Sequence, residues 1–182
     1  SIATIDLGLE DEFLRPLKVW NKFDPDPLSG CIAILDSLKE GEFGMIQVLF
    51  QGAINPWAES MYRSVSDGSG GSFFEDAPEM LPLTREKISN PLFATVIRTI
   101  GQGETNERTR EISESLARSL ISFYRTGSNR LIPLSGSLSV DVDDIIWRRS
   151  KRTGMILNSN ELASIVHIPD RSVVSSKLRQ YT

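Results

Sequence analysis

Residues that could carry nucleophilic chemistry are few and far apart in this chain. It contains one histidine, His167, and one cysteine, Cys31. Cysteine or serine catalysis needs an adjacent base, which is normally a histidine. His167 follows an apolar helical stretch, where an imidazole can interact with the terminal carbonyl groups. Cys31 falls on the apolar stripe of another expected helix and is better explained as a small hydrophobe. We therefore expect no catalytic residue.

Carboxylates are densest at Asp141, Asp143 and Asp144. They lack the spacing of a calcium-binding loop, and a single cysteine excludes a thiolate zinc cage. Acids at the start of a short helix and bases at its end complement the helix dipole. The sequence therefore predicts no metal site.

Four cations lie within five positions directly after Trp147, which exceeds what one helix end needs because the dipole effect fades within the last turn. We expect these residues to bind a partner, either an acidic protein surface or nucleic-acid phosphates. The predicted partner-binding residues are Arg148, Arg149, Lys151 and Arg152.

A nucleotide-binding loop of the type Gly-x-x-x-x-Gly-Lys-Ser/Thr does not occur in the sequence. The glycine-rich stretch 66–72 is followed by Phe73 and Phe74 and has no lysine. We interpret it as the start of a flexible insert at 66–82 and expect no cofactor to bind this chain.

Hydrophobic periodicity indicates the elements that position these residues. Strands are expected at 12–20, 43–51, 92–100 and 130–134, and helices at 26–40, 55–67, 84–89, 106–124 and 142–149. The second strand has the clearest alternation, and the long helix at 106–124 has one apolar face. A last helix should start at Asn158, since Glu161 three residues later completes a capping-box pattern.

This order of elements predicts an α+β fold of the ferredoxin-like, split βαβ type. An antiparallel sheet would have its helices on one face, with short helices added at the C-terminal end. We expect a ferredoxin-like domain at 1–136 and a helical extension at 137–182.

Composition is that of an ordinary globular domain, with 182 residues, 40% hydrophobic and 24% charged. Residues 1–91 hold 7 basic and 15 acidic side chains, whereas residues 92–182 hold 13 basic and 9 acidic ones. A basic surface on the second half is therefore feasible. The lone cysteine favours a reducing compartment, and neither a membrane-spanning segment nor a signal peptide is evident, so a cytoplasmic location is expected.

Several stretches resemble the region that precedes the ATPase core in HerA/FtsK-superfamily pumping ATPases, especially those of conjugative and type IV secretion systems. The most specific stretch runs from Leu157 to Pro169 and combines Glu-Leu-Ala with a terminal His-x-Pro. The other matching stretches are Asp26-Pro27-Leu28, Gly41-Glu42, Gln47-Val48-Leu49-Phe50, Asn55-Pro56-Trp57, Pro91 to Arg98, and Ser128-Asn129-Arg130-Leu131.

This resemblance implies a non-catalytic accessory or interaction domain of a larger DNA- or protein-translocating ATPase. ATP and Mg²⁺ would belong to the parent protein, and the partners would be further subunits or secretion and translocation proteins at the inner face of the membrane. A stand-alone nucleic-acid-binding domain is the alternative, favoured by the ferredoxin-like order and the basic second half. A small-substrate enzyme would need converging charged groups, and the sequence nominates no such set.

Overall fold

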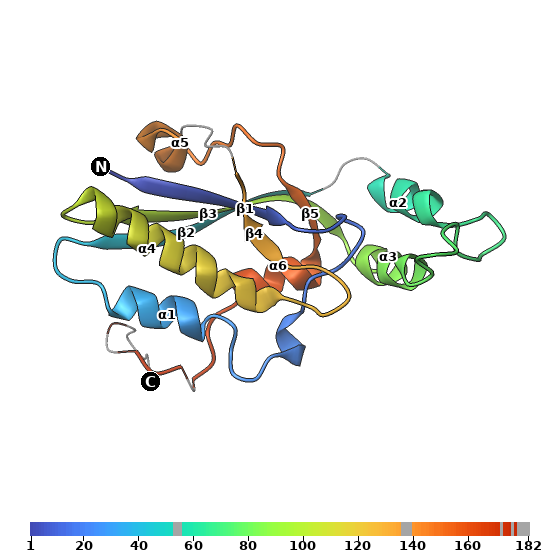
Figure 1. Ribbon diagram of the computed structural model, residues 1–182, viewed down its shortest axis with the longest axis horizontal. Coiled ribbons are helices and arrows are strands. Elements are labelled where there is room, and N and C mark those ends of the chain that lie inside the picture. Colours follow the sequence, from blue (N-terminus) through green and yellow to red (C-terminus); the bar gives the residue numbers. More distant parts are fainter. Residues whose placement is uncertain (53–55, 136–139, 172, 176, 178–182) are drawn as a thin grey trace.

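The protein has an α+β architecture, with an open antiparallel sheet and helices packed on it (Figure 1). The computed structural model describes residues 1–52, 56–135, 140–171, 173–175 and 177. The strands are β1 (Ala3–Leu9), β2 (Phe43–Gly52), β3 (Leu92–Gln102), β4 (Leu131–Pro133) and β5 (Met155–Asn158). The helices are α1 (Ser29–Asp36), α2 (Trp57–Val65), α3 (Met80–Ile88), α4 (Asn106–Ser119), α5 (Val142–Ile146) and α6 (Ser159–Val166).

The sheet has the split βαβ topology that the order of elements predicted. Its strands are arranged β2-β3-β1-β4, and every neighbouring pair is antiparallel. Strand β1 thus lies between β3 and β4, which follow it much later in the sequence. The fifth strand, β5, pairs with the first residues of β3, beyond the stretch that β1 occupies.

One face of the sheet is apolar and carries the larger helices. Leu7, Ile97 and Val48 lie side by side across β1, β3 and β2, and they belong to the main core together with residues of α4 and α6. Helix α4 approaches β3 so closely at Gly101 that a Cβ atom there would lie 2.4 Å from the carbonyl oxygen of Thr109. Glycine is therefore required at this crossing for steric reasons.

The opposite face of β3 turns Arg98 toward the segment that contains α5. This arginine is 1% exposed, and its register partners are Asp6 on β1 and Gln47 on β2. Gln47 donates from Nε2 to the carbonyl oxygen of Ile145, the penultimate residue of α5. Of the expected short C-terminal helices, α5 therefore covers the second face, whereas α6 packs on the same core as α4.

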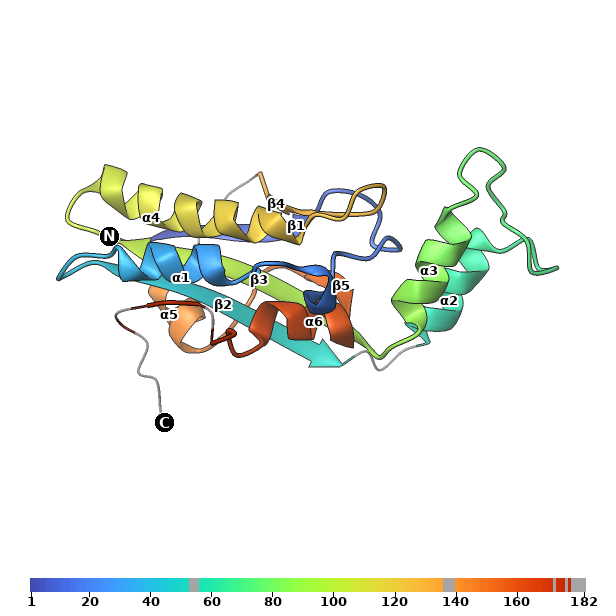
Figure 2. The ribbon, with the colours of Figure 1, turned by 90° about the horizontal axis from the view of Figure 1, so that it is seen from below.

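Helices α2 and α3 form an arm inserted between β2 and β3. They extend away from the sheet at one end of the long axis (Figures 1 and 2). Their own apolar cluster includes Met61, Val65, Met80 and Leu81. The predicted helix at 55–67 is thus present as α2, which buries Met61 and Val65, although its expected first residue, Asn55, lies outside the described residues.

The predicted strand at 12–20 is wrong. This segment runs as turns and ends in a short 3₁₀ helix, Trp20–Lys22, and the first strand is β1. Side chains bind the backbone of this segment where a neighbouring strand would otherwise do so. Ser128 Oγ donates to the carbonyl oxygen of Pro16 at 2.6 Å, and Asn129 Nδ2 donates to those of Glu12 and Arg15.

Two predicted boundaries also change. Residues 80–82, at the end of the expected insert, already belong to α3. Residues 155–158 form β5 within the main sheet, so the predicted helical extension at 137–182 also supplies a strand and shares the core of the first 136 residues. Within the described part of the chain, no helix combines the length and apolar character needed to cross a membrane.

Candidate interaction surface

The four predicted partner-binding cations follow α5 and lie together on the second face of the sheet. Helix α5 begins with a capping box, in which Asp141 and Asp144 each bind the other's backbone N–H group. Asp144 is buried and lies 3.1 Å from Lys151 Nζ and 3.5 Å from Arg149 Nε. The hydrogen bond from Lys151 lowers the pKa of Asp144. Local acids thus hold two of the four cations.

A third cation, Arg152, belongs to an ionic network that fastens the segment to the sheet. The Asp6 carboxylate lies between two guanidinium groups, with Arg98 Nε at 3.0 Å from Oδ1 and Arg152 Nε at 2.9 Å from Oδ2. Arg98 also lies 3.5 Å from the carbonyl oxygen of Arg149. Sequence reasoning missed this network, because Asp6 and Arg98 come from distant segments. It fixes the position of the residues that follow α5.

Arg148 is the fourth cation, and its side chain has no ion pair or hydrogen bond with the residues that the structure describes. Its backbone lies in the left-handed region with φ 54°, which non-glycine residues rarely adopt. Such strain persists where the surrounding structure imposes it. Here the α5 capping box on one side and the Arg152 network on the other fix the chain.

Hydrophobic side chains accompany the exposed cations. Val142 and Ile146, four residues apart on α5, are 53% and 63% exposed, and the adjoining Trp147 is 70% exposed. We call Val142, Ile146, Trp147, Arg148 and Arg149 the α5 surface. Exposed tryptophan and arginine side chains at one place are typical of protein interfaces.

His167 is engaged in holding two segments together. Its Nδ1 lies 2.8 Å from the carbonyl oxygen of Ser164, and its Nε2 lies 3.1 Å from the carboxylate of Asp26. Burial opposes ionisation of Asp26, but N–H donation from Asp170 and Leu28 and the contact with His167 lower its pKa. Although Asp26, His167 and Asp170 line an open groove of about 910 Å³, both imidazole nitrogens already face protein acceptors. This position fits the helix-end role expected from the sequence.

Cys31 is likewise placed for packing. It is 3% exposed in the main core, and burial raises the pKa of its thiol. Its sulfur lies 2.9 Å from Ser119 Oγ, and a buried thiol of raised pKa is a poor nucleophile. Among the described residues, no group of three or more His, Cys, Asp or Glu side chains could hold a metal ion.

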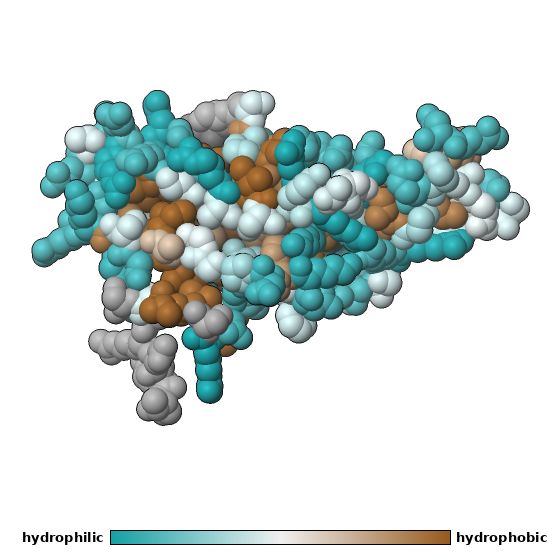
Figure 3. Space-filling view, turned by 60° about the horizontal axis from the view of Figure 1, so that its bottom comes forward, coloured by the Kyte–Doolittle hydropathy of each residue, from teal (hydrophilic) through white to brown (hydrophobic). Residues whose placement is uncertain are grey.

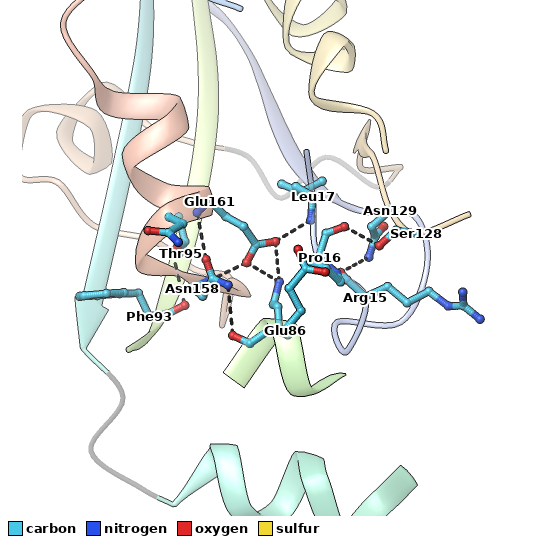
Figure 4. A network of polar contacts seen from close by, with 12 residues as sticks. Arg15, Pro16, Leu17, Glu86, Phe93, Thr95, Ser128, Asn129, Asn158 and Glu161 are labelled. Carbon is cyan, nitrogen blue, oxygen red and sulfur yellow. Dashed lines mark hydrogen bonds and ion pairs between the residues drawn. The ribbon is translucent and has the colours of Figure 1, made fainter. Parts of the chain in front are cut away.

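A second buried ionic network joins the arm to the body (Figure 4). Lys87 of α3 and Glu161 of α6 are both fully buried, and Lys87 Nζ lies 2.8 Å from each carboxylate oxygen of Glu161. The same carboxylate accepts the backbone N–H groups of Leu17 and Asn158 at 2.7 Å. Asn158 Nδ2 in turn donates to the carbonyl oxygen of Lys87. The predicted capping box of Asn158 and Glu161 is therefore confirmed, and it also binds α3 and the 12–20 segment.

Comparisons with known proteins give no relative: no protein-family model matches the chain, and no curated protein or solved structure matches it significantly.

Proposed function

We propose that this chain is a non-catalytic interaction domain of a translocating ATPase and that its partner binds the α5 surface. The observation that carries this proposal is the exposed apolar and basic surface on a rigid support. Val142, Ile146 and Trp147 are more than half exposed, next to Arg148, whose side chain has no partner among the residues that the structure describes. The Asp6, Arg98 and Arg152 network orders the segment before a partner arrives, which reduces the entropic cost of binding.

The non-catalytic role is supported by how the potentially reactive groups are used. His167 bridges Ser164 and Asp26, Cys31 packs in the core, and Glu161 is bound by Lys87 and two backbone N–H groups. Each of these side chains has a structural task in the folded chain.

The ATPase context is proposed from the resemblance of the sequence, and several of the resembling stretches contact one another in the fold. The stretch that ends in His167-Ile168-Pro169 meets the stretch Asp26-Pro27-Leu28 through the imidazole–carboxylate contact. Arg98 and Gln47, from two further stretches, lie 3.5 Å apart across β3 and β2. Residues shared with such a region would therefore maintain its fold. The parent motor would bind ATP and Mg²⁺ elsewhere and act in the cytoplasm, reaching the inner face of the membrane through partners.

The reading frame of the parent gene tests the ATPase context directly. It should continue beyond Thr182 into a nucleotide-binding loop and a Walker B strand, and the isolated chain should not hydrolyse ATP. A frame that encodes no such motif, or ATP turnover abolished by a substitution within this chain, would refute the proposal.

Nucleic-acid binding is the second candidate, because Arg148 and Arg149 are exposed beside Trp147, which could stack on a base. Fluorescence anisotropy with labelled single- and double-stranded DNA between 50 and 200 mM salt separates the two candidates. Phosphate contacts make the affinity fall steeply with salt. Tight, salt-dependent binding that Arg148→Ser and Arg149→Ser weaken would favour the nucleic-acid role over a protein partner.

A further inference from the structure

The tip of the α2–α3 arm has the opposite charge to the α5 surface. Residues 66–79 contain four acids and no base, whereas residues 145–152, which follow the three acids at the start of α5, contain four bases and no acid. Asp67 and Glu79 are used internally: Asp67 accepts the backbone N–H groups of Ser69 and Gly71, and Glu79 pairs with Arg15. Glu75 and Asp76 are exposed and have no partner among the described residues.

Two aromatic rings are exposed directly beside these free carboxylates. Phe73 and Phe74 are 65% and 37% exposed and pack edge to face, with their ring centroids 5.3 Å apart. At the α2–α3 end, small hydrophobic areas reach the surface among hydrophilic ones (Figure 3). We call Phe73, Phe74, Glu75 and Asp76 the arm tip. It combines aromatic rings with negative charge, as the α5 surface combines apolar side chains with positive charge.

The arm tip has a defined conformation. Ser66 and Ser72 form an antiparallel bridge, Phe73 N–H donates to the carbonyl oxygen of Val65 at 2.8 Å, and Asp67 closes the glycine-rich turn. At the other end of the arm, the Lys87 and Glu161 network fastens α3 to the body. The aromatic pair is thus held at a fixed place relative to the sheet.

The arm tip lies at one end of the long axis, whereas α5 lies on a face of the sheet in the other half of the molecule (Figures 1 and 2). One copy therefore cannot bring its own arm tip onto its own α5 surface. A contact between two different surfaces of identical chains is heterologous, and its repetition gives a ring or an open chain of subunits.

We propose that the arm tip of one copy binds the α5 surface of the next copy, so that this chain associates head to tail. This proposal rests on the proposed function, because it identifies the partner of the α5 surface. Phe73 and Phe74 pack against Val142, Ile146 and Trp147, and Glu75 and Asp76 pair with Arg148 and Arg149. The contact is small, so the isolated chain associates weakly, with a dissociation constant of roughly 1–100 μM.

Sedimentation velocity of charge-swapped variants tests the contact. The tip variant carries Glu75→Arg and Asp76→Arg, and the α5 variant carries Arg148→Glu and Arg149→Glu. Each alone brings like charges together, so each remains a monomer at concentrations where the unmodified chain associates. Mixing the two variants restores opposite charges at both contacts, and association returns. Circular dichroism checks that both variants are folded.

An aromatic pair of variants tests the apolar part of the contact. Phe73→Ala weakens association by roughly tenfold or more, as truncation of an aromatic anchor does. Phe43→Ala removes a ring that is 47% exposed at the start of β2 and leaves association unchanged.

Three results would overturn the head-to-tail contact. In the first, the unmodified chain remains a monomer at all concentrations up to about 1 mM, well above the expected dissociation constant. In the second, mixing the charge-swapped variants does not restore association. In the third, Phe73→Ala and Phe43→Ala change the association to the same extent. If the α5 variant lost the binding of another protein while the tip variant kept it, the α5 surface would remain a partner site and only its assignment to a second copy would fail.

Discussion

The substitution Lys87→Met is the sharpest test of how the arm is held to the sheet. It keeps most of the side-chain volume and removes the ammonium group that lies 2.8 Å from each Glu161 oxygen. Glu161 would keep the N–H groups of Leu17 and Asn158 but would remain a buried carboxylate without its counter-ion. Removing one partner of a buried ion pair costs about 3–5 kcal/mol. For a chain of this length, that loss corresponds to a decrease in Tm of about 6–20 °C.

Urea unfolding followed by circular dichroism measures this loss, and a thermodynamic cycle assigns it to the pair. Adding Glu161→Gln to Lys87→Met removes the uncompensated charge and should restore at least about 1 kcal/mol, the scale of coupling between contacting residues. Arg118→Met is the matched control, because Arg118 and Glu114 form an exposed pair on α4 that contributes about 0.5 kcal/mol. If Lys87→Met cost no more than Arg118→Met, the network would not stabilise the fold and the reasoning would be refuted.

Three further outcomes follow from single contacts. Hydrogen bonds from Arg108 lower the pKa of Glu42 to about 2 from its usual 4.5. The contribution of this carboxylate to folding stability is therefore full above pH 4.5 and disappears as the pH falls toward 2. In urea titrations, the loss of stability caused by Glu42→Gln should accordingly become smaller in acid. Gly101→Ala should destabilise the fold by about 1–3 kcal/mol, because the added methyl meets backbone of α4, and an unchanged Tm would contradict that close approach. Asn129→Ala removes the side-chain donor from the carbonyl groups of Asp11 and Arg15 and should cost about 2–4 kcal/mol, measured by urea unfolding. A loss below about 0.5 kcal/mol, the level of an ordinary surface change, would show that these bonds are dispensable.

The sequence reveals elements whose pattern is complete within one segment. The alternation in β2, the apolar face of α4 and the capping box of Asn158 and Glu161 are all local, and each predicts its element correctly. The segment 12–20 misleads because its apolar residues resemble those of a strand. Its backbone polar groups are bound by side chains such as Asn129 and Glu161, which come from distant parts of the chain. Strand β1 is absent from the prediction, although Ile5, Leu7 and Leu9 alternate with Thr4, Asp6 and Gly8 in the pattern of a half-buried strand.

The sequence locates the candidate site but does not show which of its cations form ion pairs within the fold. In the sequence after Trp147, nothing distinguishes the four cations from one another. In the fold, Arg152 pairs with Asp6, Lys151 and Arg149 pair with Asp144, and only Arg148 is left without a partner among the described residues. Which cation serves the fold and which serves a partner depends on long-range pairing that spacing does not encode. The sequence likewise shows Phe73 and Phe74 only as residues that follow a glycine-rich run. Their position relative to the α5 surface depends on the fold.

The position of β1 between β3 and β4 limits when the sheet can form during synthesis. Strand β1 is synthesised before both of its partners, and it pairs with residues 97–101 of β3 and 131–133 of β4. At a translation rate of 5–20 residues per second, β1 waits roughly 6–25 s on the ribosome before its last partner strand has been made. Because such long-range pairings must form together, refolding of the whole chain should take milliseconds to seconds. Until β3 has been made, β2, whose ten residues carry no charge, is an unpaired apolar strand to which chaperones could bind.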